Sequence, residues 1–162
     1  MSSIIFQKLR CFIKHEKGAA LAELAILVPI LILLVAAVAE FGRFFQKYTT
    51  LAKSTRTAAR YLSNHPFPEN QDEARNLVVC GKLTCTGGDA LVPGLSTANV
   101  CIQSTGVGKI ETVTISIPRA GGGGCGAPLN YQPIFNIGAL LNTGFTFTPA
   151  IAPSTTMYYV VE

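Results

Sequence analysis

The chain of 162 residues opens with a hydrophobic pattern that is helical and almost free of charge. Residues 19–39 form a stretch of twenty-one residues in which Glu23 is the only charged side chain. At 1.5 Å per residue, this stretch covers the roughly 30 Å hydrocarbon core of a bilayer. Pro29 lies near its middle, and membrane helices tolerate the loss of one backbone hydrogen bond there. The pattern predicts a transmembrane helix over residues 19–39.

The helical period continues over residues 40–63, where the helix becomes two-sided. Apolar or weakly polar residues recur every three or four positions on one face, and charged residues fill the other face. The first face consists of Phe41, Phe44, Phe45, Tyr48, Leu51, Ala52, Thr55, Ala59 and Leu62. We therefore expect one continuous helix of about 45 residues that ends at the proline-rich segment 65–68. Its apolar face packs either on a partner helix or on the chain's own domain.

Beyond residue 63 the pattern changes to short elements. Asn70 is placed to cap a short helix that runs to about Val79, and Gly81 ends it. Residues 109–118 alternate between apolar and hydroxyl side chains, which predicts a strand with one buried face. Further strands are expected at residues 98–103, 155–161 and, as a short one, 144–148, with a glycine turn at 121–124.

These patterns predict an α+β protein in which a long N-terminal helix packs on a small antiparallel β-sheet. The expected organisation is a basic leader over residues 1–18, the transmembrane helix over 19–39, an amphipathic extension over 40–63 and an exported β-rich domain over 64–162.

Charge sets the expected orientation. The net charge is +4, and only 14% of the residues are charged while 49% are hydrophobic. The leader holds four cations and one acid, so the positive-inside rule places the N-terminus in the cytoplasm. Residues 64–162 hold six acids and four cations, and a nucleic-acid-binding surface would need the opposite balance.

The junction between the leader and the helix carries the most specific chemistry. Glu23 follows Gly18 by five positions and lies inside the apolar stretch, where a lone charge costs about 2.5–3.5 kcal/mol. A cut after Gly18 would give Ala19 a free α-ammonium, which could pair with Glu23 of a neighbouring subunit. In a second interpretation, Glu23 reaches the headgroups from one turn inside the bilayer.

Two other uses of the N-terminal segment stay open. It could be a plain membrane anchor that is not processed. It could also be a cleaved secretory signal, because Ala37-Val38-Ala39 fits the small-x-small rule, although the region before the apolar core is long and includes Glu23.

The same residues resemble a known family. A basic leader that ends in glycine, with glutamate at the fifth position after it, resembles prepilins that a type IV prepilin peptidase processes. More specifically, residues 16–63 resemble the TadE-like family of the tight-adherence (Flp) pilus system. The matching positions are Gly18, Ala19, Glu23, Leu24, Pro29, Glu40-Phe41-Gly42-Arg43 and Ala58-Ala59-Arg60.

The resemblance implies a minor pilin or pseudopilin-like component of such a pilus or of a related secretion assembly. It implies cleavage between Gly18 and Ala19 by a prepilin peptidase. It also implies contact with the lipid bilayer, other pilins and the assembly platform of the bacterial inner membrane, with the C-terminal domain periplasmic or extracellular. The alternative is a membrane-tethered envelope protein that binds a ligand and does not assemble.

The chain contains five cysteines, four of them in the expected exported domain. Cys11 lies in the leader, so cleavage would leave Cys80, Cys85, Cys101 and Cys125. In an oxidising periplasm these four favour disulfides. Three pairings are open; we favour Cys80 with Cys85 and Cys101 with Cys125. A zinc site is the rival, but the spacing and the lack of a nearby histidine disfavour it.

The residues do not indicate an enzyme. His15 lies in the leader and His65 in the proline-rich helix end, so the domain lacks the histidine that a serine or cysteine triad needs. Asp72 and Glu73 are adjacent in the first turn of the short helix, where they complement the helix dipole. We expect no cofactor and no metal.

Overall fold

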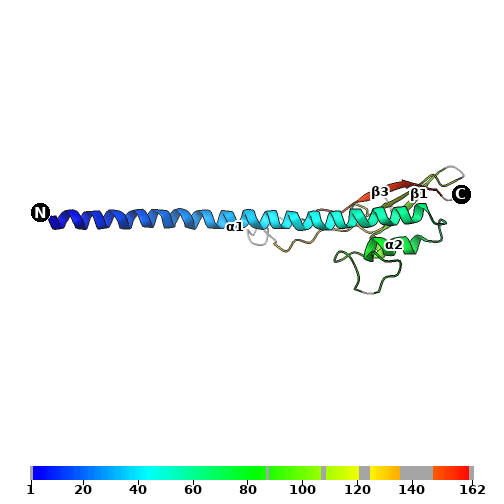
Figure 1. Ribbon diagram of the computed structural model, residues 1–162, viewed down its shortest axis with the longest axis horizontal. Helices are drawn as coiled ribbons and strands as arrows, with labels where there is room; N and C mark the ends of the chain where they lie inside the picture. Colours follow the sequence, from blue (N-terminus) through cyan, green and yellow to red (C-terminus); the bar gives the residue numbers. More distant parts are fainter. Residues whose placement is uncertain (1, 87, 107–108, 121–124, 136–147, 161–162) are drawn as a thin grey trace. The chain divides into compact units, whose positions relative to one another are not determined.

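The computed structural model describes residues 2–86, 88–106, 109–120, 125–135 and 148–160, and for residues 2–17 it describes the backbone alone. The chain divides into two units, residues 1–41 and residues 42–162. Helix α1 (Ser2–Ser63) supplies all of the first unit that is described and opens the second (Figure 1).

The N-terminal helix is continuous, as predicted, but it begins earlier than expected. We expected it to start near Ala19, whereas α1 begins at Ser2. Residues 2–17 contain no glycine or proline and include helix formers such as lysine, arginine, glutamine and glutamate, so nothing in them stops a helix. The helix continues through Pro29 and ends at Ser63, just before the proline-rich segment.

The second unit combines helices with one antiparallel sheet. Strands β1 (Cys101–Thr105), β2 (Thr112–Ser116) and β3 (Ser154–Tyr158) lie in the order β1-β2-β3. Ile115 in the central strand is paired with Ile102 on one side and Thr155 on the other. The predicted α+β class is confirmed, with α2 and the strands beside the C-terminal part of α1 (Figure 1).

The core of this unit is built on the apolar face of α1. Leu51, Ala58 and Leu62 are fully buried, and so are Val113 and Ile115 of the central strand. The hydroxyl groups of Thr55 in α1 and Thr155 in β3 lie 3.3 Å apart. The chain's own domain therefore covers this face, which decides between the two uses expected for it over residues 51–62.

An irregular segment between β2 and β3 adds the largest fully buried side chain among the described residues. Tyr131 is 1% exposed, and its ring meets Phe44 edge-on with 5.6 Å between centroids. Its backbone N–H donates to the carbonyl of Pro149 at 2.9 Å, and the N–H of Ile151 donates to Leu129 at 2.8 Å. Two distant parts of the chain are thus joined beside α1.

The end of the described chain returns to the end of α1. The N–H of Val160 donates to the carbonyl of Ser63 at 3.0 Å. The hydroxyl of Tyr159 donates to the carbonyl of His65 at 3.0 Å and accepts from the N–H of Phe67 at 2.9 Å. The first bond satisfies a carbonyl that the helix end leaves without an intrahelical partner, and the other two fix the turn that follows.

The short helix lies where it was predicted, but its start differs in detail. Helix α2 spans Gln71–Cys80, and Gly81 follows in the left-handed conformation with a φ of 71°. Asn70 precedes the helix without capping it through its side chain. Its amide instead donates to the carbonyl of Pro66 at 3.0 Å, because the proline-rich turn brings that acceptor within reach.

The predicted strands are found with shifted bounds. The strand expected at 98–103 begins at Cys101, because Ser96 and Asn99 first close a short 3-10 turn, η1 (Thr97–Asn99). There the Asn99 side-chain oxygen accepts from the N–H of Ser96 at 2.8 Å. The glycine turn at 121–124 and most of the strand predicted at 144–148 lie outside the described residues.

Truncation of Leu62 tests the contact between α1 and the sheet. We expect Leu62→Ala to lower the free energy of unfolding of the second unit by about 2–5 kcal/mol, because it opens a cavity in a fully buried site. Urea unfolding of the full chain in detergent, followed by tyrosine circular dichroism, measures this. Thr57→Ala, on the exposed side of the same helix, is expected to change it by less than about 0.5 kcal/mol.

Candidate functional site

The predicted cleavage junction lies within one uninterrupted helix. Gly18, Ala19 and Glu23 are all exposed positions of α1. A Cβ atom added at Gly18 would meet nothing within 4 Å. Glycine in a helix interior costs roughly 0.5–1 kcal/mol relative to alanine, so the packing of the described chain does not account for this residue.

Ala19 and Glu23 are four positions apart in the helix. Residues at this spacing lie on the same face, one turn apart, with about 5–6 Å between their Cβ atoms. A carboxylate at this place is within reach of a cation at the start of the helix or of a neighbouring helix. Over the residues with described side chains, no hydrogen bond or ion pair of Glu23 is present.

The helix that follows the junction exposes its apolar side chains on all sides. From Leu21 to Val38, eleven large hydrophobic side chains are 40–67% exposed. Within the part of the chain that the structure describes, this helix is the single one long and apolar enough to cross a membrane. Its most apolar window has a mean hydropathy of 2.8, and none of that window is buried.

Two disulfides cross-link the second unit in the pairing that we favoured from the sequence. Cys80, at the end of α2, bonds to Cys85, with 6.1 Å between their Cα atoms. Cys101, at the start of β1, bonds to Cys125, with 5.2 Å between Cα atoms. The first closes a short turn, while the second joins the sheet to the segment that leads toward Tyr131.

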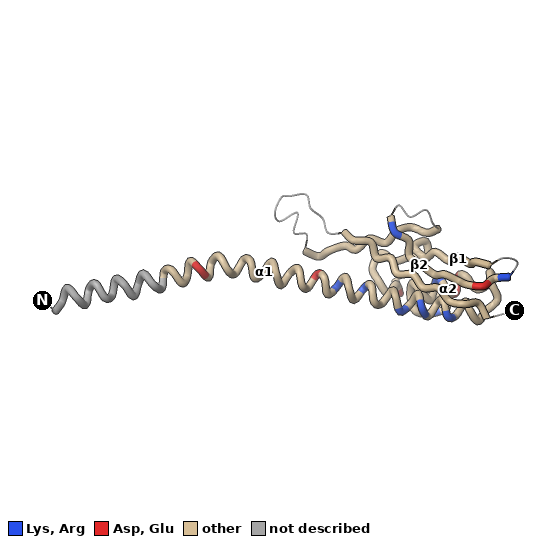
Figure 2. Tube along the Cα trace, turned by 90° about the horizontal axis from the view of Figure 1, so that it is seen from above, with Lys and Arg blue, Asp and Glu red and all other residues tan. Residues whose placement is uncertain are grey.

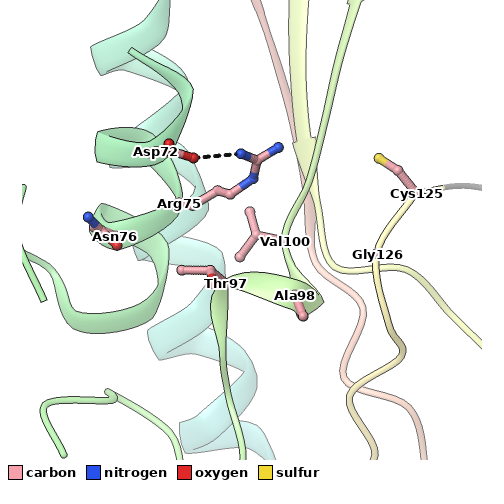
Figure 3. Close-up of a pocket in the computed structure, with 8 residues that line it drawn as sticks. All are labelled: Asp72, Arg75, Asn76, Thr97, Ala98, Val100, Cys125 and Gly126. Carbon is pink, nitrogen blue, oxygen red and sulfur yellow. Dashed lines mark hydrogen bonds and ion pairs between the residues drawn. The ribbon is translucent and has the colours of Figure 1, made fainter. Parts of the chain in front are cut away.

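The described surface of the second unit holds open pockets. One of about 520 Å³ lies between α2, η1 and the Cys125 segment (Figure 3). In it, Arg75 points toward Asp72 and forms an ion pair of 2.8 Å. Cys125 is held in its disulfide, so it offers no thiolate. No histidine lines this pocket among the described residues.

The second unit holds another open pocket, of about 830 Å³, near the end of the sheet. Tyr158, Tyr159, Lys109 and Glu111 are among the residues that line it. In the described parts of the chain, no cluster of three or more His, Cys, Asp or Glu side chains is placed to hold a metal ion.

The pKa of one carboxyl group in the loop after α2, that of Asp89, is shifted by its neighbours. The Thr86 hydroxyl donates to Asp89 at 2.9 Å, and the Lys82 ammonium lies 3.1 Å away. The bond from Thr86, followed by the bond and the charge of Lys82, lowers the pKa of Asp89 from its ordinary value. The ionised form is therefore favoured, and the stabilisation of this exposed turn is lost as the pH falls through the lowered pKa.

Comparison with known proteins identifies the segment that contains the junction. The model of a family described as TadE-like protein matches residues 18–60. Residues 18–60 are a TadE-like segment. The match begins at the glycine of the predicted cut and includes the TadE-like helix up to Arg60. Searches of curated proteins and of solved structures found no match to the chain.

The match confirms the resemblance noted from the sequence and gives it bounds. It supports a pilus-associated component with an N-terminal apolar helix. Residues 61–162 lie outside the TadE-like segment. Sequence reasoning did not find Tyr131 or Tyr159 as residues that organise this part, because their partners lie far away along the chain.

The two disulfides are expected to differ in their effect on stability. A cross-link stabilises mainly by restricting the unfolded chain, and the restriction grows with the length of the loop. The loops here have sequence separations of 24 for Cys101–Cys125 and 5 for Cys80–Cys85. We expect Cys101→Ser/Cys125→Ser to cost about 3.5 kcal/mol and Cys80→Ser/Cys85→Ser about 2 kcal/mol of unfolding free energy. Chemical unfolding of both double variants without reductant measures the difference, and equal losses would contradict the loop argument.

Proposed function

We propose that the chain is a minor pilin or pseudopilin-like subunit of a tight-adherence pilus or a related secretion assembly. Residues 19–39 anchor it in the bacterial inner membrane, with the N-terminus in the cytoplasm and the β-rich unit exported. A prepilin peptidase removes the leader after Gly18. The mature helix then joins other pilin-like helices at the assembly platform.

The observation that carries this proposal is the open glycine at the start of the TadE-like segment. A Cβ atom at Gly18 meets no other atom within 4 Å, so glycine is dispensable to the packing of the chain. A peptidase that cuts beside this residue would explain the glycine, because a narrow active site can exclude any residue that has a side chain. The position of Glu23 in the same segment adds to this explanation.

The anchor role is supported by the surface of the helix. Its large apolar side chains between Leu21 and Val38 face outward. Water would disfavour such a surface, at roughly 25 cal/mol per Å² of apolar area, whereas the hydrocarbon core of a bilayer or the neighbouring helices of a fibre would cover it. The disulfides of the second unit fit export to an oxidising compartment.

Glu23 supplies the assembly step in this proposal. Hydrolysis after Gly18 converts the Ala19 amide into an α-ammonium. In a bundle of such helices, the ammonium of one subunit pairs with Glu23 of its neighbour, and both charges are neutralised in an apolar environment. The pair fixes the axial register, since a shift of one turn would leave two isolated charges in hydrocarbon.

The cut after Gly18 is tested by the mass of the mature protein. In a host with the prepilin peptidase, we expect the membrane-extracted chain to begin at Ala19. Gly18→Leu should leave the chain uncut, since the added side chain blocks the peptidase. Intact-mass spectrometry measures both.

Gly42→Leu is the matched control for this experiment. Gly42 is also a helical glycine with nothing within 4 Å of an added Cβ, and its replacement should leave the cut unchanged. A mature N-terminus at Glu40 would show a secretory signal instead. A wild-type chain that still begins at Met1 would leave a plain membrane anchor, and the cleavage proposal would fail.

The pairing of Glu23 is tested by an isosteric change. We expect Glu23→Gln to leave insertion and leader cleavage intact and to lower incorporation into the assembled fraction about tenfold or more, because the α-ammonium of the neighbour loses its counter-charge. Quantitative immunoblotting of the sheared or cross-linked fibre fraction measures this. Leu27→Met, one turn further along the helix, is the control and should assemble normally. Normal assembly of Glu23→Gln would favour the tethered envelope protein that never forms a fibre.

A further inference from the structure

The side of α1 that faces away from the core of the second unit carries only positive charge. Lys53, Arg56 and Arg60 are exposed and follow one another at intervals of three and four residues, so they lie on one side of the helix. We call these three residues the basic face. Figure 2 marks the Lys and Arg positions in blue, and several follow one another along this part of the α1 backbone.

The described chain offers no counter-charge to the basic face. Among the described residues, no ion pair of Lys53, Arg56 or Arg60 is present; Arg75–Asp72 and Lys82–Asp89 lie outside the basic face. Like charges three and four residues apart destabilise a helix. The folded unit therefore does not account for three cations at these positions, and an acidic partner outside the chain would relieve their repulsion.

A membrane surface fits this face poorly. A helix that binds anionic lipid lies in the interface with its apolar side in the bilayer and its cations on the opposite side. The apolar side of this part of α1 is used elsewhere: Leu51, Ala58 and Leu62 are fully buried by the exported unit. Beside the basic face, Leu91 shares a pocket with Lys53 and is 42% exposed. One such side chain offers little apolar area for insertion into a bilayer, so the charge favours a soluble acidic protein surface.

The chain itself presents such an acidic surface. Glu69 and Asp72, at the start of α2, are both exposed, and we call them the acidic edge. Asp72 keeps 89% of its side chain exposed although it pairs with Arg75. Residues 64–162 carry two more acids than cations, while residues 40–63 carry five cations and one acid. No ion pair joins the basic face to the acidic edge within the described chain.

We propose that the basic face of one copy binds the acidic edge of a second copy. The two surfaces differ, so the contact is head-to-tail and repeats from copy to copy rather than closing a symmetric pair. The proposal goes beyond the assembly role given above, because it concerns the exported unit alone and needs neither the cut after Gly18 nor the charge of Glu23.

A charge swap between two tagged copies tests this contact. One full-length variant carries Lys53→Glu/Arg56→Glu/Arg60→Glu and the other carries Glu69→Lys/Asp72→Lys. Two tagged copies of the same variant are co-expressed, extracted in non-ionic detergent and pulled down through one tag. We expect each variant to lose about tenfold or more of its self-association, because both surfaces then carry the same sign.

The mixture of the two variants supplies the decisive result. In it, each altered surface meets an altered surface of opposite sign, and each unaltered surface also keeps its partner. Co-purification should therefore return to near the wild-type level, and it should weaken when salt rises from about 0.05 M to about 0.5 M. Lys82→Glu/Lys109→Glu/Arg119→Glu changes the net charge by as much as the basic-face variant but lies elsewhere, and should associate normally.

Three outcomes would overturn the proposal. Undiminished self-association of the two variants would mean that other surfaces hold the copies together. Loss without recovery in the mixture would mean that the two surfaces do not face each other. Association of wild-type copies only after anionic phospholipid is added would assign the basic face to lipid. Repeating the wild-type and mixture measurements with Gly18→Leu in every copy keeps the result separate from leader cleavage.

Discussion

The structure of the second unit, the body of the protein, depends on the burial of one face of α1. Leu51, Ala58 and Leu62 are fully covered by the body, and the central strand contributes Val113 and Ile115 to the same core. The core cluster joins this face to buried residues of α2 and of the sheet, so the body would lose one side of its core without it. Residues 42–63 are accordingly part of the folded body rather than a connector to it.

The single helix α1 therefore carries two different patterns of apolar side chains. Between Leu21 and Val38 the side chains are apolar on every side and exposed, whereas between Leu51 and Leu62 they are apolar on one side and covered. The change from the first pattern to the second coincides with the return of charged residues such as Arg43 and Lys53. A membrane or a helical bundle suits the first pattern, and a globular domain suits the second.

Local signals made much of this fold predictable. The alternation around Val113 and Ile115 predicted the central strand, and Gly81 marked the end of α2, because both depend on a few neighbouring residues. Tyr131 and Tyr159 could not be predicted as organising residues: Tyr131 meets Phe44, and Tyr159 bonds His65 and Phe67, and no local period encodes such distant contacts. The spacing of Gly18 and Glu23 in the sequence was enough to predict a cleavage junction. The open space around Gly18, in contrast, depends on how the chain folds and is seen only in the structure.

The return of Tyr159 and Val160 to the end of α1 has a consequence for the order of events in the cell. Ribosomes make the helix before these residues, so the end of α1 gains these bonds only after the chain has been synthesised as far as residue 160. Contacts between residues about a hundred positions apart are slow to form. The body therefore closes only once β3 and the residues that follow it are available to bond to the end of α1.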